Sequence, residues 1–135
     1  MTQEKHLFEY AVIRVVPQVE REEFINVGVI IYSKKEKFLQ CKYHLDRERL
    51  KALSTEIDIN EVGEHLKSFE RISKGMDDSG PIGKLDIASR FRWLTATRST
   101  IVQTSKVHSG FCPDLEEGLE KIYAQLVLKP IGNGS

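Results

Sequence analysis

FEYAVIRVVPQVEREEFINVGVIIY, residues 8–32, is the stretch that decides the fold. Its two ends, residues 8–16 and 24–32, are rich in β-branched and aromatic side chains, and Pro17 closes the first of them. Apolar side chains fill successive as well as alternate positions, which is typical of strands that are covered on both faces. The stretch therefore predicts two central β-strands joined by a charged connection.

A third strand is predicted after the short polar turn of residues 33–37. In residues 38–45 apolar side chains alternate with polar ones, so that Leu39, Cys41 and Tyr43 share one face and the other face is wet. Because such a short turn favours an antiparallel hairpin, we expect the first 45 residues to form a meander.

Helices are predicted from residue 46 onward. Spacings of three and four separate the apolar residues Ile59, Val62, Leu66, Phe69 and Ile72, and aspartates that can cap helix starts stand at Asp46, Asp58, Asp86 and Asp114. Between the helices, residues 75–84 carry three glycines and a proline and are predicted as a loop. Residues 98–105 are predicted as a fourth strand.

The predicted order of elements is β-β-β-α-α-α-β-α. It indicates an α+β fold with a mainly antiparallel sheet of about four strands and helices packed on it. A chain of 135 residues with 40% apolar side chains has the size of one domain. We expect a single domain over residues 1–129 and a flexible C-terminal tail over residues 130–135.

Composition and charge exclude several classes of function. The 20 basic and 20 acidic residues balance, so no overall field attracts nucleic acid or an anionic membrane. No apolar stretch reaches the roughly 20 residues that cross a bilayer. Cys41 and Cys112 form no CxxC pair, and no signal peptide precedes the first apolar run, so we expect a cytoplasmic protein without membrane contact.

An anion site is one interpretation of a cluster of basic and hydroxyl side chains in the second half of the chain. Guanidinium forks and hydroxyls suit a phosphate or a carboxylate, and an imidazole binds an anion or transfers a proton. The alternative is solvated charge and packing, since residues two positions apart point to different sides of a helix. The cluster consists of Arg90, Arg92, Arg98, Ser99, Thr100 and His108.

A second set of candidates breaks the apolar pattern of the two central strands. Asn26 and Gly28 interrupt the second strand, and Arg14 interrupts the first. A buried amide needs hydrogen-bond partners, and glycine weakens a strand interior. Either Gly28 lets a ligand or another backbone approach while Asn26 binds it, or Gly28 marks a bulge or tight helix packing while Asn26 ties down a loop.

Other features of the sequence give weaker signals. Trp93, the only tryptophan, either anchors the core, which we expect, or stacks on a ligand ring at the surface. The four histidines have no short metal-binding spacing, so we expect no metal and no cofactor. Residues 80–83 lack the Lys-Ser/Thr of a phosphate-binding loop. Cys112, just before Pro113 at a helix start, could have a lowered thiol pKa.

Six separated blocks of the chain resemble one family. They are residues 10–17, 22–29, 80–83, 90–94, 98–100 and 107–110, which read YAVIRVVP, EEFINVGV, GPIG, RFRWL, RST and VHSG. In this order they resemble the bacterial family called domain of unknown function 3037, over nearly the whole chain. The resemblance implies a free-standing bacterial domain with no established activity, sometimes associated with genes for kinases similar to the HipA toxin.

Two functions agree with these observations. The first is a non-catalytic binding or accessory module that docks on a protein partner, with a HipA-like kinase as the implied candidate, through the second strand and the arginine cluster. The second is a phosphate-directed enzyme or nucleic-acid-processing factor, in which the arginines hold phosphate and His108 acts as acid or base. Because no catalytic motif is present we favour the first; a homodimer is an alternative arrangement, and nucleic acid is the less favoured partner.

Overall fold

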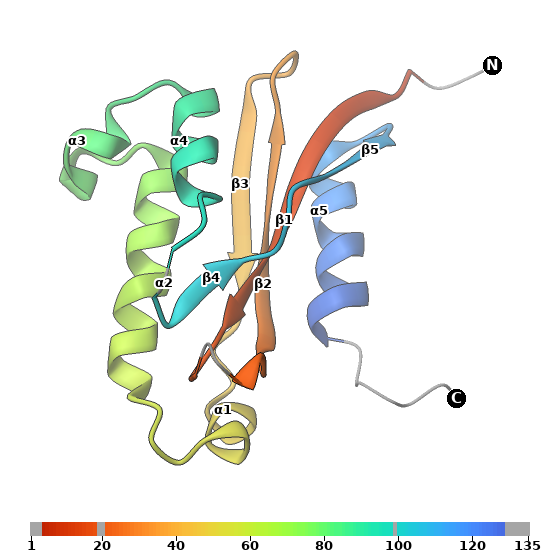
Figure 1. Cartoon of the computed structure of the whole chain (residues 1–135). Coiled ribbons are helices and arrows are strands. Elements are labelled where there is room, and N and C mark those ends of the chain that lie inside the picture. The colour runs from red at the N-terminus through yellow and green to blue at the C-terminus, as the bar shows by residue number, and fades with distance from the viewer. Residues whose placement is uncertain (1–3, 19–20, 99, 129–135) are drawn as a thin grey trace.

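The computed structural model describes residues 4–18, 21–98 and 100–128, so the predicted tail lies outside the described residues. Figure 1 shows the course of the chain. The strands are β1 (His6–Val15), β2 (Ile25–Ser33), β3 (Phe38–Tyr43), β4 (Val102–Thr104) and β5 (His108–Cys112). The helices are α1 (Arg47–Leu53), α2 (Ile59–Lys74), η2 (Asp77–Ser79), α3 (Gly80–Gly83), α4 (Ile87–Leu94), α5 (Leu115–Tyr123) and η3 (Ala124–Leu128).

The strands form one antiparallel sheet in the order β3-β2-β1-β4, with β5 also paired to β1. β1 is therefore central: β2 lies along one of its edges, and β4 and β5 share the other edge (Figure 1). The predicted α+β fold with a mainly antiparallel sheet is confirmed. The sheet has five strands, one more than the sequence pattern indicates.

β4 and β5 are two parts of one interrupted strand. Ile13 pairs with Thr104 and Tyr10 pairs with His108, so three steps along β1 match four steps along the facing segment. Such a one-residue insertion is a β-bulge, and it exchanges the faces to which alternate side chains point. The strand predicted over residues 98–105 is thus shorter than expected, and its continuation beyond the bulge is an additional strand.

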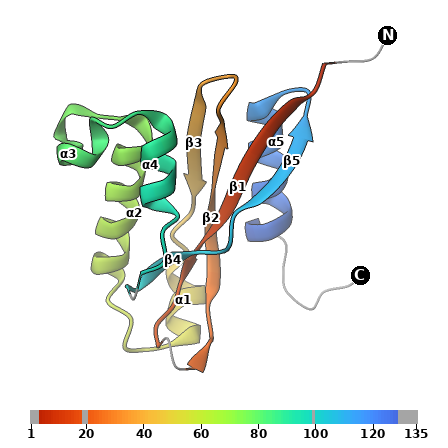
Figure 2. The same ribbon diagram turned by 45° about the horizontal axis from the view of Figure 1, so that its top comes forward.

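The helices cover both faces of the sheet. α1, α2 and α4 lie on one face and α5 lies on the other (Figures 1 and 2). Alternate residues of β1 divide between two cores, because Ala11, Ile13 and Val15 belong to the core with α2 and α4, whereas Phe8 packs with α5. All of residues 27–33 in β2 are buried, as predicted for a central strand.

The helix starts are capped as predicted. The side chains of Asp46, Asp58, Asp86 and Asp114 each accept hydrogen bonds from backbone N–H groups of the following turn. Gly75 ends α2 in the left-handed conformation with a φ of 65°. The loop predicted over residues 75–84 is wrong in part, because it contains the short helices η2 and α3, with Pro81 in the first turn of α3.

Gly28 is required by the close approach of β2 and β3. The register of β2 against β1 shifts between Ile13 and Arg14, which makes a bulge at this point, and Gly28 pairs with Tyr43 on the other side. A Cβ atom at Gly28 would lie 2.6 Å from the Lys42 carbonyl oxygen and 2.7 Å from Tyr43 Cβ. Bulge and tight packing therefore account for Gly28 without a ligand.

Replacing Gly28 with alanine is expected to destabilise the fold, because the strand backbone has to move to make room for a methyl group. We expect a loss of about 1–3 kcal/mol in the free energy of unfolding, measured by urea denaturation. The matched control is Gly63→Ala in α2, where the new Cβ would meet only Leu45 Cδ2 at 3.7 Å. This control should gain about 0.5–1 kcal/mol from helix propensity, and equal effects of the two changes would contradict the assignment.

Candidate functional site

The arginines of the predicted anion cluster do not gather at one place. Arg90 holds the end of α2: its Nη1 donates to the carbonyl oxygens of Ile72 at 3.1 Å and Ser73 at 3.2 Å. Arg92 is exposed, and its bond to the Ala88 carbonyl, at 3.5 Å, lies within its own helix. Arg90 therefore has the role of a helix C-cap, which satisfies carbonyl groups that the helix leaves free.

Arg98 and His108 lie in different surroundings again. The Arg98 guanidinium stacks on the Trp93 indole, 3.7 Å from its centroid, and Nη2 donates to the Trp93 carbonyl oxygen. His108 lies on β5, with its ring centroid 5.3 Å from that of Tyr10. Trp93 is 38% exposed, so the expected role as a core anchor is wrong. Phe91, which stacks on Tyr32, takes that role instead.

Part of the predicted cluster lines a cleft between α2 and the segment from α4 to β4. The cleft has a volume of about 230 Å³. It brings Arg98 and Thr100 together with Trp93 and with His65 of α2, whereas Arg90, Arg92 and His108 are not among its lining residues. Ser99, the remaining member of the predicted cluster, lies outside the described residues. We call this hollow the α2–α4 cleft.

Arg14 and Asn26 are neighbours on paired strands. They face each other across β1 and β2, and the Arg14 guanidinium lies 3.9 Å from the centroid of the Phe24 ring. Asn26 Nδ2 donates to the Leu126 carbonyl oxygen at 3.1 Å, so Asn26 links β2 to the middle of η3. Arg14 Nε and Asn26 Oδ1 are both buried without a hydrogen-bond partner among the described residues. Burial also lowers the pKa of Arg14.

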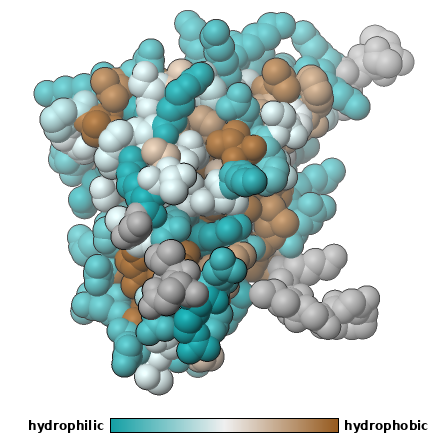
Figure 3. Space-filling model, in the orientation of Figure 1, coloured by the Kyte–Doolittle hydropathy of each residue, from teal (hydrophilic) through white to brown (hydrophobic). Residues whose placement is uncertain are grey.

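An exposed apolar surface lies at the other end of the sheet, and the sequence gives little sign of it. Leu7 of β1 and Phe111 of β5 are directly paired, and they are 55% and 67% exposed. With Tyr32 they line a hollow of about 700 Å³, at whose rim stand the lysines Lys5, Lys34 and Lys35. We call these six residues the β5 surface. In Figure 3 hydrophobic atoms reach the surface over this upper part of β1 and β5.

The position of Phe111 on an exposed strand could not be predicted from the sequence, because its neighbours in the chain are polar or small. The segment HSGFC has no apolar alternation that would mark a strand. The only hint is the contrast of one large aromatic side chain with its surroundings. The other face of β5 is closed, since a Cβ at Gly110 would lie 2.7 Å from the Phe8 ring and the Cys112 side chain lies over Gly118 of α5.

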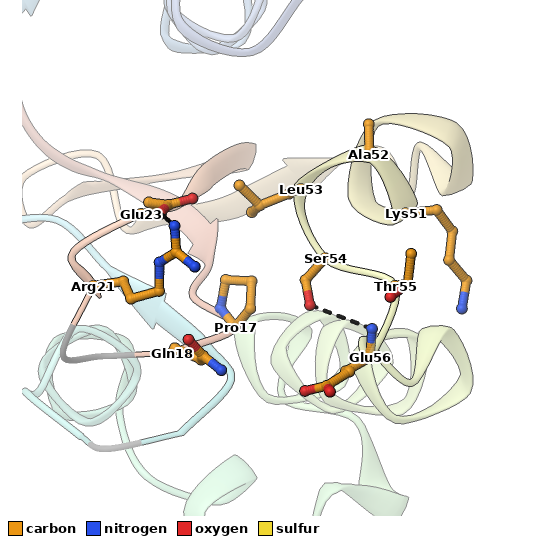
Figure 4. A pocket seen from close by; sticks show the side chains of 10 residues that line it. All are labelled: Pro17, Gln18, Arg21, Glu23, Lys51, Ala52, Leu53, Ser54, Thr55 and Glu56. Atoms are coloured by element: carbon orange, nitrogen blue, oxygen red, sulfur yellow. Dashed lines mark hydrogen bonds and ion pairs between the residues drawn. The ribbon is translucent and has the colours of Figure 1, made fainter.

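A third hollow lies between the β1–β2 connection and the α1–α2 connection. It has a volume of about 410 Å³, and Figure 4 shows its mostly polar lining. Three of its charged groups have partners, because Arg21 forms an ion pair with Glu23 at 2.6 Å and Lys51 Nζ donates to the Ile57 carbonyl at 3.1 Å. Residues 19 and 20 of the connection lie outside the described residues. We place no ligand in this hollow.

Neither cysteine has the features of a nucleophile. Burial raises the pKa of Cys41 to about 11, and the Cys41 sulfur lies 3.5 Å from the Ser73 hydroxyl. Burial also raises the pKa of Cys112, so the lowered pKa considered for its position before a helix is wrong. Since the thiolate is the reactive form, both thiols are poor nucleophiles at neutral pH.

Alkylation with iodoacetamide tests this protection. At pH 8 we expect Cys41 in the folded chain to react roughly 100-fold more slowly than a cysteine of ordinary pKa, because two pKa units remove most of the thiolate. Mass spectrometry of the two cysteine peptides measures each rate, with the same chain in urea as the control. Modification of Cys41 at equal rates with and without urea would contradict the assigned burial.

Among residues 4–18, 21–98 and 100–128, no three His, Cys, Asp or Glu side chains lie close enough together to hold a metal ion. Within the same ranges, no helix has both the length and the apolar character to span a membrane.

Comparison with known proteins gives one match. The family model described as "Protein of unknown function (DUF3037)" matches residues 10–127 of the chain. No curated protein and no solved structure matches it.

Proposed function

Because the chain belongs to the family of proteins of unknown function DUF3037, a name that assigns no activity, we propose a function from its surface. The chain is a non-catalytic binding module, and its β5 surface docks on an extended, acidic segment of a protein partner. The exposed Leu7–Phe111 pair beside a free sheet edge is the observation that carries this proposal.

The position of β5 supports strand addition. Among the described residues β5 pairs with β1 alone, so its second edge offers backbone N–H and C=O groups to another strand. An extended segment laid along this edge would place alternate side chains beside Phe111, on the face of the sheet that Leu7 shares. Burying these two side chains provides a hydrophobic contribution, and the backbone bonds fix the direction of the segment.

The positively charged lysines at the rim of the hollow favour a partner with acidic side chains. The β5 surface includes three lysines, and Glu9 is the one acidic residue among the described residues that line the hollow. The carboxylate of Glu36, in the same hairpin as Lys34 and Lys35, lies 3.1 Å from His6 Nδ1. A segment with acidic side chains beside its apolar ones complements this rim. Face-to-face pairing of two copies would instead bring the lysines together.

The alternative of a phosphate-directed enzyme has less support. It needs Arg90, Arg92, Arg98 and His108 around one reacting group, and their observed partners are the end of α2, the Ala88 carbonyl, Trp93 and Tyr10. The second strand also offers a partner less surface than β5, because residues 27–33 are buried. A kinase similar to the HipA toxin, a bacterial source and a cytoplasmic location stay predictions from the sequence.

The experiment is a quantitative pull-down with the full chain as bait, repeated with Phe111→Asp and with the pair Lys34→Glu and Lys35→Glu. We expect one stoichiometric partner, and each variant should reduce its recovery about tenfold or more. Peptides from that partner, tested by titration, should bind only if they combine acidic and apolar side chains. The matched control is Arg92→Glu, an equally exposed charge reversal away from the β5 surface.

Three outcomes would contradict the proposal. Equal recovery of the partner by all variants would place the interface elsewhere. Circular dichroism of each variant is the folding control, and a loss of binding is assigned to the surface only for variants that fold. A concentration-dependent dimer, seen by light scattering and abolished by Phe111→Asp, would make a second copy the occupant instead. Co-purifying nucleic acid without a protein partner would favour the phosphate-directed alternative.

A further inference from the structure

The α2–α4 cleft is separate from the β5 surface and combines an apolar floor with a positive rim. The floor is made of the buried side chains of Phe69, Ile72 and Leu94. Arg98 is the charged residue of this lining, which holds no aspartate or glutamate among the described residues, and the His65 side chain in the lining lies 3.8 Å from the Glu61 carboxylate outside it. The cleft therefore offers burial to an apolar group and a positive charge to an anion.

Arg98 is held in place without a counter-ion. Its guanidinium rests flat on Trp93, and one of its N–H groups donates to the Trp93 carbonyl oxygen. No carboxylate within the described ranges forms an ion pair with it. A guanidinium has five N–H donors, so most of its capacity is left for another acceptor. Stacking fixes the plane of the fork before a ligand arrives.

A second observation is that this charge is partly withdrawn from water. Burial lowers the pKa of Arg98, which means that the surroundings give its charge less stabilisation than water does. A guanidinium in such a place gains more from an anionic partner than a fully solvated one. Two other polar groups of the cleft bond within the chain, since Thr100 Oγ1 donates to the Val102 carbonyl at 2.6 Å and Gln103 Nε2 donates to the Thr100 carbonyl at 2.9 Å.

We propose that the α2–α4 cleft binds a small carboxylate with an apolar body. The carboxylate is received by the Arg98 fork, and the apolar body lies on Phe69, Ile72 and Leu94. The volume of about 230 Å³ is below the roughly 300–1,000 Å³ of pockets for drug-sized ligands, which limits the ligand to a short chain or a single ring. An inorganic phosphate fits less well, because one arginine faces it and the apolar floor stays uncovered.

Trp93 provides the readout, because it is the only tryptophan and lies beside Arg98 at the cleft. The probe is hexanoate, titrated into the full chain while the Trp93 emission is recorded. Hexanol and hexylamine have the same chain without the negative charge, and inorganic phosphate has charge without the chain. We expect saturable binding of hexanoate and at least about tenfold weaker binding of the other three.

Variants locate the site. Arg98→Gln keeps a hydrogen-bonding side chain without the charge, and it should weaken hexanoate about tenfold or more while leaving hexanol unchanged. Arg92→Gln removes an exposed arginine of α4 that does not line the cleft, and it should have no effect. If Arg98→Gln does not fold, chemical shifts of the unaltered chain replace it, and hexanoate should then move the signals of His65, Phe69 and Trp93.

Several results would overturn the inference. One is the absence of any saturable signal with hexanoate. Another is equal affinity for hexanoate and hexanol, which would remove the role of the charge. Full affinity in the Arg98→Gln variant, or shifts confined to residues outside the cleft, would also overturn it. None of these results bears on the β5 surface, so this inference and the proposed partner docking fail or stand independently.

Discussion

The pairing of β1 on both of its edges is the constraint on which the rest of the structure depends. β2 occupies one edge along its length, whereas the other edge is divided between β4 and β5. A strand in this position pairs its backbone groups on both edges, and most of the apolar side chains of β1, on both faces, are buried. The helices on the two sides of the sheet bury these apolar side chains, and this burial stabilises the fold.

Bulges in the strands on either side of β1 determine which side chains point to each face of the sheet. β2 has its bulge opposite residues 13 and 14 of β1, and the β4–β5 segment has its bulge between Thr104 and His108. The second bulge exchanges inward and outward positions, so that Gly110 falls beneath the Phe8 ring and Phe111 falls beside Leu7 on the open side. Without the added residue, position 111 would face the Phe8 side of the sheet and position 110 would face the open side. The most exposed aromatic group of the described chain is thus a product of register.

The sequence predicts the parts of this fold that follow a period. The apolar patterns of the three N-terminal strands and of α2 can each be recognised within one segment of the chain. The four aspartate caps are recognised by their residue type just before a helix. The β4–β5 segment was only half predictable, because a bulge breaks the period and Ser109 and Gly110 dilute its apolar character. The candidate site was harder still. Arg90 and Arg98 belong to one stretch of sequence, but one caps α2 and the other stacks on Trp93, and only tertiary contacts separate these roles.

The division of the β1 edge also has a consequence for how the chain folds. Val15 pairs with Val102 and Leu7 pairs with Phe111, so most of the chain must be synthesised before the central strand acquires its second neighbour. Contacts this distant in sequence are slow to form, because closing a long loop costs conformational entropy before the paired strands gain any stabilising contacts. Until then the hairpins of β1, β2 and β3 carry an open edge. In a crowded cell the same edge of another nascent copy is its nearest competitor, which makes strand exchange between copies the characteristic misfolding route of this architecture.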